Sequence, residues 1–270
     1  MENISLVLSG GGSRGSYQMG CWAALREMGL DTRINVVAGT SIGAINGALM
    51  VQQDYDRAME LWESIHPAVL FDIFREKNLS GKLPNWKLYY TLWKDYQNNG
   101  AVRFEQGKTL LRKLMREPDI KDSSIQFGLT TFNLDRRKGE GLFSHQIPDG
   151  LLADYIIASA SLPIFRAHDI MGERYMDGGF YDNFPVGLAL RQAPENPVIC
   201  INISMKGSLA TAALKQKYPK IRLEVLQPSK SLGSPLHFSS GNIQNNVNLG
   251  YKDTLKYFEQ KSIKTLLNGT

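Results

Sequence analysis

Hydrophobic positions follow two alternating spacings over the first fifty residues of the chain. Residues 4–8 (ISLVL) form a short apolar run that predicts a buried strand, and residues 35–41 (NVVAGTS) predict a second one. Residues 16–30 place apolar side chains at helical spacing, and residues 42–53 predict a helix rich in small residues. Strand–helix–strand–helix order indicates a parallel sheet covered by helices, and hence an α/β fold.

The pattern changes between residues 54 and 118. This segment is helical in period, but polar, proline and glycine stretches interrupt it. We interpret it as a helical cap inserted beside the sheet. It is rich in aromatic residues: Trp62, Phe71, Phe74, Trp86, Tyr89, Tyr90, Trp93 and Tyr96. Most of these rings are expected to fill a core, but some could instead be exposed beside the opening of a site and form an interfacial face.

The α/β pattern resumes after residue 118. Strands are expected over residues 125–134, 139–147, 197–204 and 222–228, a hairpin over 168–179, and helices over 151–163, 186–193 and 242–262. We therefore expect a main α/β domain over residues 1–205, with the cap inserted at 54–118. Residues 206–270 are expected to form a C-terminal extension that packs on the same domain.

Charge is distributed unevenly along the 270 residues. The chain carries a net charge of +5, and residues 206–270 hold ten Lys and Arg against three Asp and Glu. A basic end could favour an anionic membrane surface or an acidic partner, although a lysine-rich solvated exterior is the simpler interpretation. Nothing has the charge density of a nucleic-acid-binding arm, so no nucleic-acid partner is expected.

The two cysteines and the amino-terminal residues give information about the cellular compartment of the protein. Cys21 and Cys200 each lie in an apolar setting, which predicts buried free thiols rather than a disulfide or a metal site. Residues 1–10 lack the basic start and long apolar run of a signal peptide, and no stretch is apolar enough to span a membrane. A cytoplasmic protein is expected, while export by a route without an N-terminal signal stays open.

The first candidate motif is the glycine-rich string that follows the first strand, Gly10-Gly11-Gly12-Ser13-Arg14-Gly15. It satisfies GxGxxG between a strand and a helix, as a dinucleotide-binding turn would, and Asp31 lies about where a ribose-binding acid would be. A turn needed only for packing is the alternative.

The second strand ends in Gly39-Thr40-Ser41-Ile42-Gly43, which satisfies GxSxG. In this nucleophile elbow the serine occupies a tight, strained turn whose small neighbours keep its hydroxyl clear. The amides of residues 10–12 could then stabilise the oxyanion of an acyl-transfer intermediate. Arg14 could neutralise nearby negative charge or brace the loop.

A nucleophilic serine also needs a base, and Asp177 in YMDGGFYDNFP is the best-placed candidate. Gly178 and Gly179 would leave its carboxylate accessible, although Asp-Gly could simply form a hairpin turn. Of the four histidines, only His237 gives the Ser–Asp–His order of α/β-hydrolases. Those enzymes usually reach their serine after several strands, so His237 is more simply interpreted as a surface or packing residue.

Three motifs occur in order along the chain: GGGxRG, GxSxG after the next strand, and Asp-Gly-Gly much later. This order resembles that of the patatin-like phospholipases. The resemblance runs from Ile4 to about Pro185 and includes residues 158–165, 172–179 and 183–185. It implies a three-layer α/β/α fold and hydrolysis of fatty-acyl esters of phospholipids or other lipids, with transient contact to a membrane surface and no metal or cofactor.

Carried onto this chain, the resemblance makes Ser41 the nucleophile and Asp177 the base of a dyad without histidine. It makes Gly10, Gly11 and Gly12 the oxyanion hole. The supporting positions are Arg14, Gly15, Gly39, Gly43, Gly178 and Gly179.

Two other functions compete with this hypothesis. A nucleotide-dependent oxidoreductase would use the first glycine turn but would leave the GTSIG elbow unexplained. A non-catalytic lipid-binding or signalling protein could keep the fold, although it would not need Ser41, Asp177 and the glycines together.

Overall fold

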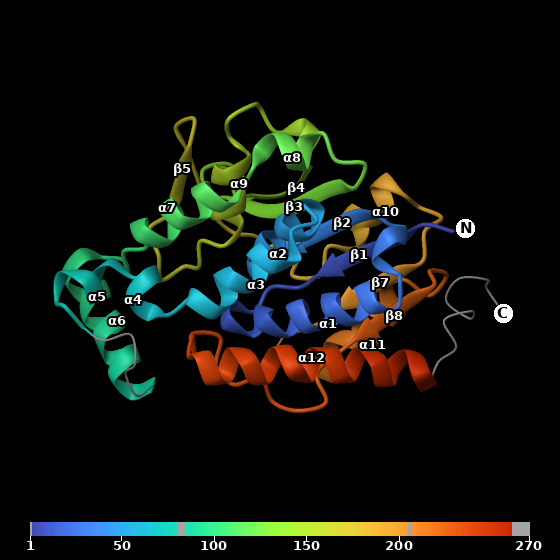
Figure 1. Cartoon of the computed structure of the whole chain (residues 1–270). Helices are drawn as coiled ribbons and strands as arrows, with labels where there is room; N and C mark the ends of the chain where they lie inside the picture. Colours follow the sequence, from blue (N-terminus) through green and yellow to red (C-terminus); the bar gives the residue numbers. More distant parts are fainter. Residues whose placement is uncertain (1, 80–84, 205–206, 261–270) are drawn as a thin grey trace.

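The computed structural model describes residues 2–79, 85–204 and 207–260. Within these residues an eight-stranded mixed sheet has the order β5-β6-β3-β2-β1-β7-β8, with β4 also paired to β3 (Figure 1). The pairs β1–β2, β1–β7, β2–β3 and β7–β8 are parallel, and those among β3, β4, β5 and β6 are antiparallel. The strands are β1 (Ile4–Leu8), β2 (Ile34–Thr40), β3 (Gln126–Asn133), β4 (Lys138–Phe143), β5 (His168–Ile170), β6 (Glu173–Asp177), β7 (Val198–Ile201) and β8 (Leu223–Leu226).

Helices cover both faces of the sheet. The side chains of Leu6 and Leu8 on β1 belong to one buried cluster, and that of Val7 belongs to another, because successive strand residues point to opposite faces. The first cluster includes residues of α1, α2 and α12, and the second includes residues of α10 and α11. This confirms the three-layer α/β/α fold. The helices outside the cap are α1 (Ser16–Glu27), α2 (Ile42–Val51), α9 (Leu152–Ser159), α10 (Val186–Gln192), α11 (Gly207–Lys217) and α12 (Ser240–Gln260).

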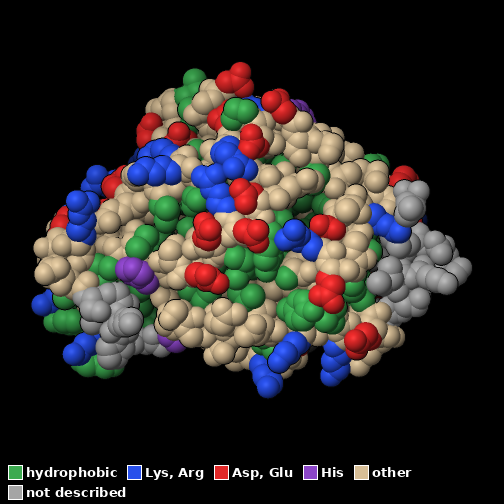
Figure 2. Space-filling model, in the orientation of Figure 1, with side chains coloured by type: hydrophobic (Ala, Val, Ile, Leu, Met, Phe, Trp, Pro, Cys, Tyr) green, Lys and Arg blue, Asp and Glu red, His purple; other side chains and the backbone are tan. Residues whose placement is uncertain are grey.

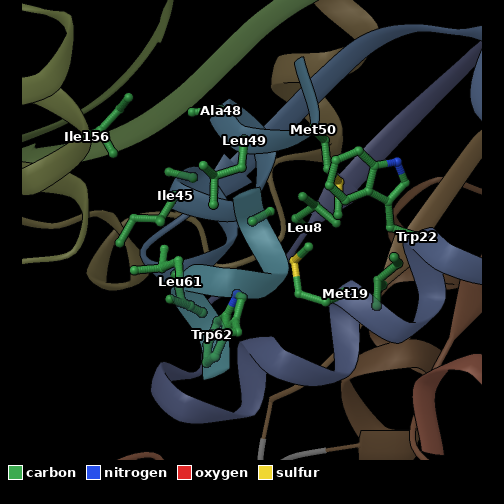
Figure 3. Packing of buried hydrophobic residues seen from close by; sticks show 14 of the residues in the cluster. Leu8, Met19, Trp22, Ile45, Ala48, Leu49, Met50, Leu61, Trp62 and Ile156 are labelled. Carbon is green, nitrogen blue, oxygen red and sulfur yellow. The ribbon is translucent and has the colours of Figure 1, made fainter. Parts of the chain in front are cut away.

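The larger of the two clusters joins the sheet to the helices that carry the site. Figure 3 shows Leu8 of β1 with Met19 and Trp22 of α1 and with Leu49 and Met50 of α2. These five side chains are at least 96% buried. Burying each is worth about 1.5–3 kcal/mol, so this face is a rigid support for the loops at the strand ends.

Within the described parts of the segment from residue 54 to 121, residues 54–79 and 85–121, there are six helices. They are α3 (Tyr55–Ser64), α4 (Pro67–Leu70), α5 (Asp72–Glu76), α6 (Asn85–Asn99), α7 (Glu105–Leu114) and α8 (Glu117–Lys121). Trp62, Phe71 and Phe74 are buried in the core. The five rings on α6 are instead exposed, so the set divides between buried and exposed members, and a contact of the exposed rings with lipid stays a prediction.

Several predicted boundaries move for local reasons. The strand expected over 139–147 ends at Phe143, where the Gln146 side chain accepts the Phe143 amide and a 3₁₀ turn begins. The helix expected over 151–163 ends at Ser159, ahead of a proline. The helix α11 was not predicted, because the apolar residues of its segment do not form a stripe at helical spacing: of its described leucines, Leu214 is buried and Leu209 is exposed. Residue 206 and residues 261–270 of the expected extension lie outside the described residues.

Both cysteines are buried and free, as predicted. Among the residues that the structure describes, no helix combines the length and the apolar character that crossing a bilayer would need.

Strand pairing brings the ends of β2 and β6 together. β4 pairs with β3 from Gly128 to Asn133 and so occupies one edge of β3. On the other edge β2 pairs up to Thr130, and β6, running in the opposite direction, pairs from Thr131. The carboxyl ends of β2 and β6 therefore meet head to head beside two consecutive residues of β3. Whatever follows β2 must lie next to whatever ends β6.

Candidate active site

Ser41 follows β2 directly and precedes α2. Its backbone has φ 57° and ψ −126°, a conformation that costs a non-glycine residue energy. The tight turn requires glycine on the helix side, because a Cβ at Gly43 would lie 2.3 Å from the carbonyl oxygen of Leu8. These features are those of a nucleophile elbow, as the GxSxG string predicted.

Asp177 ends β6 and faces Ser41. The Ser41 hydroxyl donates to Asp177 Oδ2 at 2.6 Å, and the Gly179 amide donates to Oδ1 at 2.7 Å. Both side chains are buried, Asp177 with 3% of its surface exposed. The structure thus brings together the two residues that the sequence separates by 136 positions.

Burial raises the pKa of the Asp177 carboxyl from 3.8 to about 6. Loss of solvent is the main cause, because it penalises the charged carboxylate. The hydrogen bonds from Ser41 and Gly179 favour the carboxylate and oppose this rise. Asp177 is therefore a stronger base than an exposed aspartate and is still mostly ionised at pH 7.

The end of α9 and the segment that follows it hold both residues in place. The Ser41 amide donates to Ser159 Oγ at 2.9 Å, and the Asp177 amide donates to the carbonyl oxygen of Ser161 at 2.8 Å. Sequence reasoning gave Ser159 and Ser161 no role. The stretch ASASLPIF that contains them was part of the family resemblance and was the available signal.

The glycine-rich loop lies against the elbow. A Cβ at Gly10 would approach the Ser41 Cβ to 3.0 Å, and the Gly10 amide donates to Asn183 Oδ1 at 3.0 Å. The Gly10 amide is therefore already occupied, unlike the expectation that all three amides would be available. Among the described residues, the amides of Gly11 and Gly12 have no hydrogen-bond acceptor. Asn183 was noted in the sequence only as part of a matching stretch.

A loop near the carboxyl terminus fixes the far side of the glycine-rich loop. Gly12 has φ 61°, and a Cβ there would lie 2.3 Å from the Pro235 carbonyl oxygen. That same oxygen accepts the Ser13 amide at 2.7 Å. Arg14 donates from two nitrogens to the carbonyl oxygen of Gly233, at 2.8 and 2.6 Å. Arg14 was expected either to neutralise nearby negative charge or to brace the loop, and these hydrogen bonds brace the loop.

The remaining supporting glycines surround the dyad. The Gly15 carbonyl oxygen accepts a hydrogen bond from Nδ2 of Asn46, a residue of α2, at 2.9 Å. A Cβ at Gly39 would lie 2.2 Å from the Gly43 carbonyl oxygen, and one at Gly178 would lie 2.2 Å from the Thr130 carbonyl oxygen. A side chain at Gly39 would therefore clash within the elbow, and one at Gly178 would push the Asp177 turn away from β3.

An apolar cavity of about 80 Å³ opens from Ser41. Gly12 lines it beside the hydroxyl, and the rest of the lining is almost wholly hydrocarbon. This volume is several times what one water molecule requires, and the walls offer water few polar partners. The lining comes from α2, α3, α4, α7 and the loops around residues 160–165 and 235–238: Ile42, Ile45, Leu61, Trp62, Ile65, Leu70, Phe71, Phe104, Gly107, Leu110, Leu111, Ala160, Leu162, Phe165, Pro235, Leu236 and Phe238.

Two alternative assignments lose their geometric basis. His237 Nε2 is paired with Ser239 Oγ at 3.0 Å, and the hydrogen bonds to the described Asp177 carboxylate come from Ser41 and Gly179. Asp31 precedes β2, whereas the glycine-rich loop follows β1, and these two strands are parallel. Asp31 therefore lies at the amino-terminal end of these parallel strands, whereas the loop lies at their carboxyl-terminal end. Asp31 could not bind a ribose at that loop.

A family model described as patatin-like phospholipase matches residues 6–190. The chain therefore belongs to the patatin-like phospholipase family, a family of acyl hydrolases, as its motifs predicted. It is 30% identical over 189 residues to the lysophospholipase NTE1 of Saccharomyces cerevisiae, across 68% of this chain and 10% of the yeast protein. It is 29% identical over 187 residues to the lysophospholipase nte1 of Aspergillus terreus, across 68% of this chain and 11% of that protein. The chain spans about a tenth of the length of these relatives.

Solved structures share the fold at low sequence identity. Human GIVD cytosolic phospholipase A2 superposes with a TM-score of 0.60 at 8% identity, over 100% of this chain and 61% of the human one. VipD from Legionella pneumophila superposes with a TM-score of 0.56 at 16% identity, over 96% of this chain and 67% of that one. These likenesses agree with the patatin-like three-layer architecture.

Proposed function

We propose that this protein is a serine hydrolase that cleaves fatty-acyl esters of lipids, with Ser41 as nucleophile and Asp177 as base. The observation that carries the proposal is the 2.6 Å hydrogen bond from the Ser41 hydroxyl to the buried Asp177 carboxylate, at the head of an apolar cavity. Membership in the patatin-like phospholipase family supports the same chemistry.

In the first half-reaction Ser41 Oγ attacks the ester carbonyl while its proton passes to Asp177 Oδ2. The negative charge on the former carbonyl oxygen is stabilised by the amides of Gly11 and Gly12, which begin the 3₁₀ turn before α1. As the intermediate collapses, the bond to the leaving alcohol breaks and Asp177 returns the proton to that alcohol. Ser41 is left as an acyl ester.

In the second half-reaction a water molecule attacks the acyl-enzyme and gives its proton to Asp177. The second intermediate uses the same amides, and its collapse breaks the ester to Ser41, whose oxygen takes the proton back. Atoms and charge balance over the cycle, with a fatty acid and an alcohol as products. The raised pKa of Asp177 improves proton transfer in both steps, since a base close to the working pH is the most effective.

The acyl chain of the substrate would lie in the hydrocarbon-lined cavity. Among the described residues that line it, none has a charged side chain for a headgroup, so we assign the cavity to the chain that stays on Ser41. Lysophospholipids and phospholipids are the substrate class that we propose, in keeping with the names of the fungal relatives.

The proposal is tested with purified protein and a p-nitrophenyl ester. Wild type should release p-nitrophenol and should be labelled by a fluorophosphonate at Ser41. Ser41→Ala and Asp177→Asn should each abolish turnover, and only Ser41→Ala should also remove the labelled residue. His237→Ala is the matched control and should keep most of the activity, because His237 contacts Ser239 rather than the dyad.

Circular dichroism and melting curves should show that all three variants stay folded. Loss of activity in His237→Ala would favour a triad, and failure of wild type on every short and long ester would favour a lipid-binding protein without catalysis. If wild type is active, mass spectrometry of a mixed lipid extract treated with wild type or with Ser41→Ala would then identify the lipid that is consumed.

A further inference from the structure

The cap helix α6 presents a row of aromatic rings to solvent. Trp86 is 66% exposed and Trp93 is 55% exposed, which is unusual for the most hydrophobic rings of a globular chain. Tyr89, Tyr90 and Tyr96 are exposed on the same helix. At about 100° per residue these five positions fall within about 120° of the helix circumference. They therefore form one stripe, which we call the α6 aromatic face.

The other side of α6 is anchored to the protein. Leu88 and Leu92 are buried in the main core cluster. The Asp95 carboxylate is fully buried, accepts the Arg103 amide at 3.0 Å and pairs with the Arg103 guanidinium at 3.0 Å. Packing and ion pairing on the inner side of α6 therefore determine the orientation of this helix. The α6 aromatic face is its solvent-exposed side.

The exposed charges on the described part of α6 are positive. Lys87 and Lys94 are exposed beside the rings and lie over them, with Lys87 Nζ 5.4 Å from the Trp86 ring centre and Lys94 Nζ 5.0 Å from that of Tyr90. The carboxylate of the helix, Asp95, faces inward. Figure 2 shows hydrophobic and basic side chains together at the lower left of the molecule, where Figure 1 places α6.

The aromatic face adjoins the site. The Tyr89 hydroxyl is hydrogen-bonded to the Ser234 hydroxyl. The next two residues, Pro235 and Leu236, line the apolar cavity that leads to Ser41. A surface that received α6 would therefore lie beside the loop that borders the cavity.

We propose that the α6 aromatic face docks the protein on a lipid bilayer that contains anionic headgroups. Trp and Tyr combine an apolar ring with a polar group and partition to the headgroup boundary, and lysines beside them are attracted to anionic lipids. The inference rests on the proposed function in that the docked bilayer supplies the ester, but docking itself does not require Ser41.

The test measures binding in the Ser41→Ala background, so that hydrolysis does not change the membrane. Co-sedimentation is measured with vesicles of phosphatidylcholine alone and of equal parts phosphatidylcholine and phosphatidylserine. Adding Trp86→Ala and Trp93→Ala should weaken binding to both, by about tenfold per ring if each removes some 55 Å² of buried apolar area. Adding Lys87→Ala and Lys94→Ala should weaken binding about fivefold per lysine, and only to the vesicles with phosphatidylserine.

The matched control removes two apolar side chains that lie away from α6 and are more exposed than either tryptophan. Met171 is 79% exposed on the β5–β6 turn and Leu209 is 76% exposed on α11, so Met171→Ala/Leu209→Ala should bind vesicles like the parent. With Ser41 restored, Trp86→Ala/Trp93→Ala should hydrolyse dissolved p-nitrophenyl butyrate at the wild-type rate and vesicle lipid much more slowly.

Equal binding by the tryptophan variant and the control would overturn the inference, as would failure of the Ser41→Ala protein to bind either vesicle. It would also be overturned if light scattering showed that the two tryptophans mediate self-association without changing vesicle binding. If wild type hydrolyses no ester but the ring-dependent binding is present, the proposed function fails and the docking surface stands.

Discussion

Replacing Asp177 by asparagine is expected to stabilise the protein at neutral pH while it abolishes turnover. Asparagine has nearly the same shape, and its oxygen can accept the Gly179 amide while its NH₂ group donates to Ser41 Oγ. What the substitution removes is a buried negative charge. The folded protein must keep that charge away from water in order to have a base.

The magnitude follows from the pKa of Asp177. Burial raises this pKa from 3.8 to about 6, so the folded protein holds the carboxyl proton more tightly than the unfolded chain does. The contribution of the protonated group to stability is complete below the unfolded pKa and is lost as pH rises through about 6. At 1.36 kcal/mol per pKa unit, the charged carboxylate lowers the free energy of unfolding by about 3 kcal/mol at neutral pH. At about pH 4 it lowers this free energy by about 0.5 kcal/mol.

Thermal melting of wild type and Asp177→Asn at several pH values checks this reasoning. A difference of about 3 kcal/mol should raise the melting temperature of the variant by about 8 °C at neutral pH, and the difference should nearly vanish at about pH 4. Asp135→Asn is the matched control of opposite sign, because the exposed ion pair with Arg174 lowers the pKa of Asp135. That variant should not be more stable than wild type at neutral pH.

A variant Asp177→Asn that melts at or below the wild-type temperature at neutral pH would refute the argument. So would a gain that is the same at every pH, because a pH-independent gain would come from packing and not from the carboxylate charge.

Three further results are expected. The kcat/KM of wild type should fall about tenfold per pH unit below about pH 6, as Asp177 becomes protonated and can no longer accept the Ser41 proton; a profile that is flat down to about pH 4 would exclude Asp177 as the base. Asn183→Ala should lower kcat by about tenfold or more with little change in KM, because the Gly10 amide loses its acceptor and the glycine-rich loop loses its position; an unchanged kcat measured with a short ester would contradict this role. Leu110→Trp should fill part of the cavity and reduce turnover of long-chain esters much more than that of a butyrate ester; a parallel loss for both chain lengths would mean that the cavity does not hold the acyl chain.

Local patterns in the chain were enough to predict most elements of the sheet and the elbow. The apolar run of β1, the GxSxG string and the helix after it each depend on neighbouring residues, so their spacing is visible in the sequence. The missed helix α11 shows the limit of this approach, since among its described side chains Leu214 belongs to a buried cluster but no repeated apolar stripe marks the helix. The exposed rings of α6 were anticipated only as one of two interpretations, because aromatic residues at helical spacing do not reveal which face of the helix is covered.

The parts of the site that depend on distant partners were beyond the sequence. Asn183 and Ser159 act through single hydrogen bonds to the backbone of Gly10 and Ser41, and a lone polar residue has no periodicity that would single it out. The carbonyl oxygens of Gly233 and Pro235 hold the glycine-rich loop through backbone contacts, for which the identity of the side chain gives little signal.

The sequence by itself determined that this chain forms an α/β sheet with a strained serine after the second strand and an Asp-Gly-Gly turn far downstream, because each of these is a local preference of the backbone. Only the tertiary structure decided that the serine and the aspartate meet. Their contact depends on two strands of opposite direction that share one edge of β3 and end beside Thr130 and Thr131. The same packing withdraws the carboxylate from water and so determines its basicity, since desolvation is a property of the folded surroundings and not of the residue.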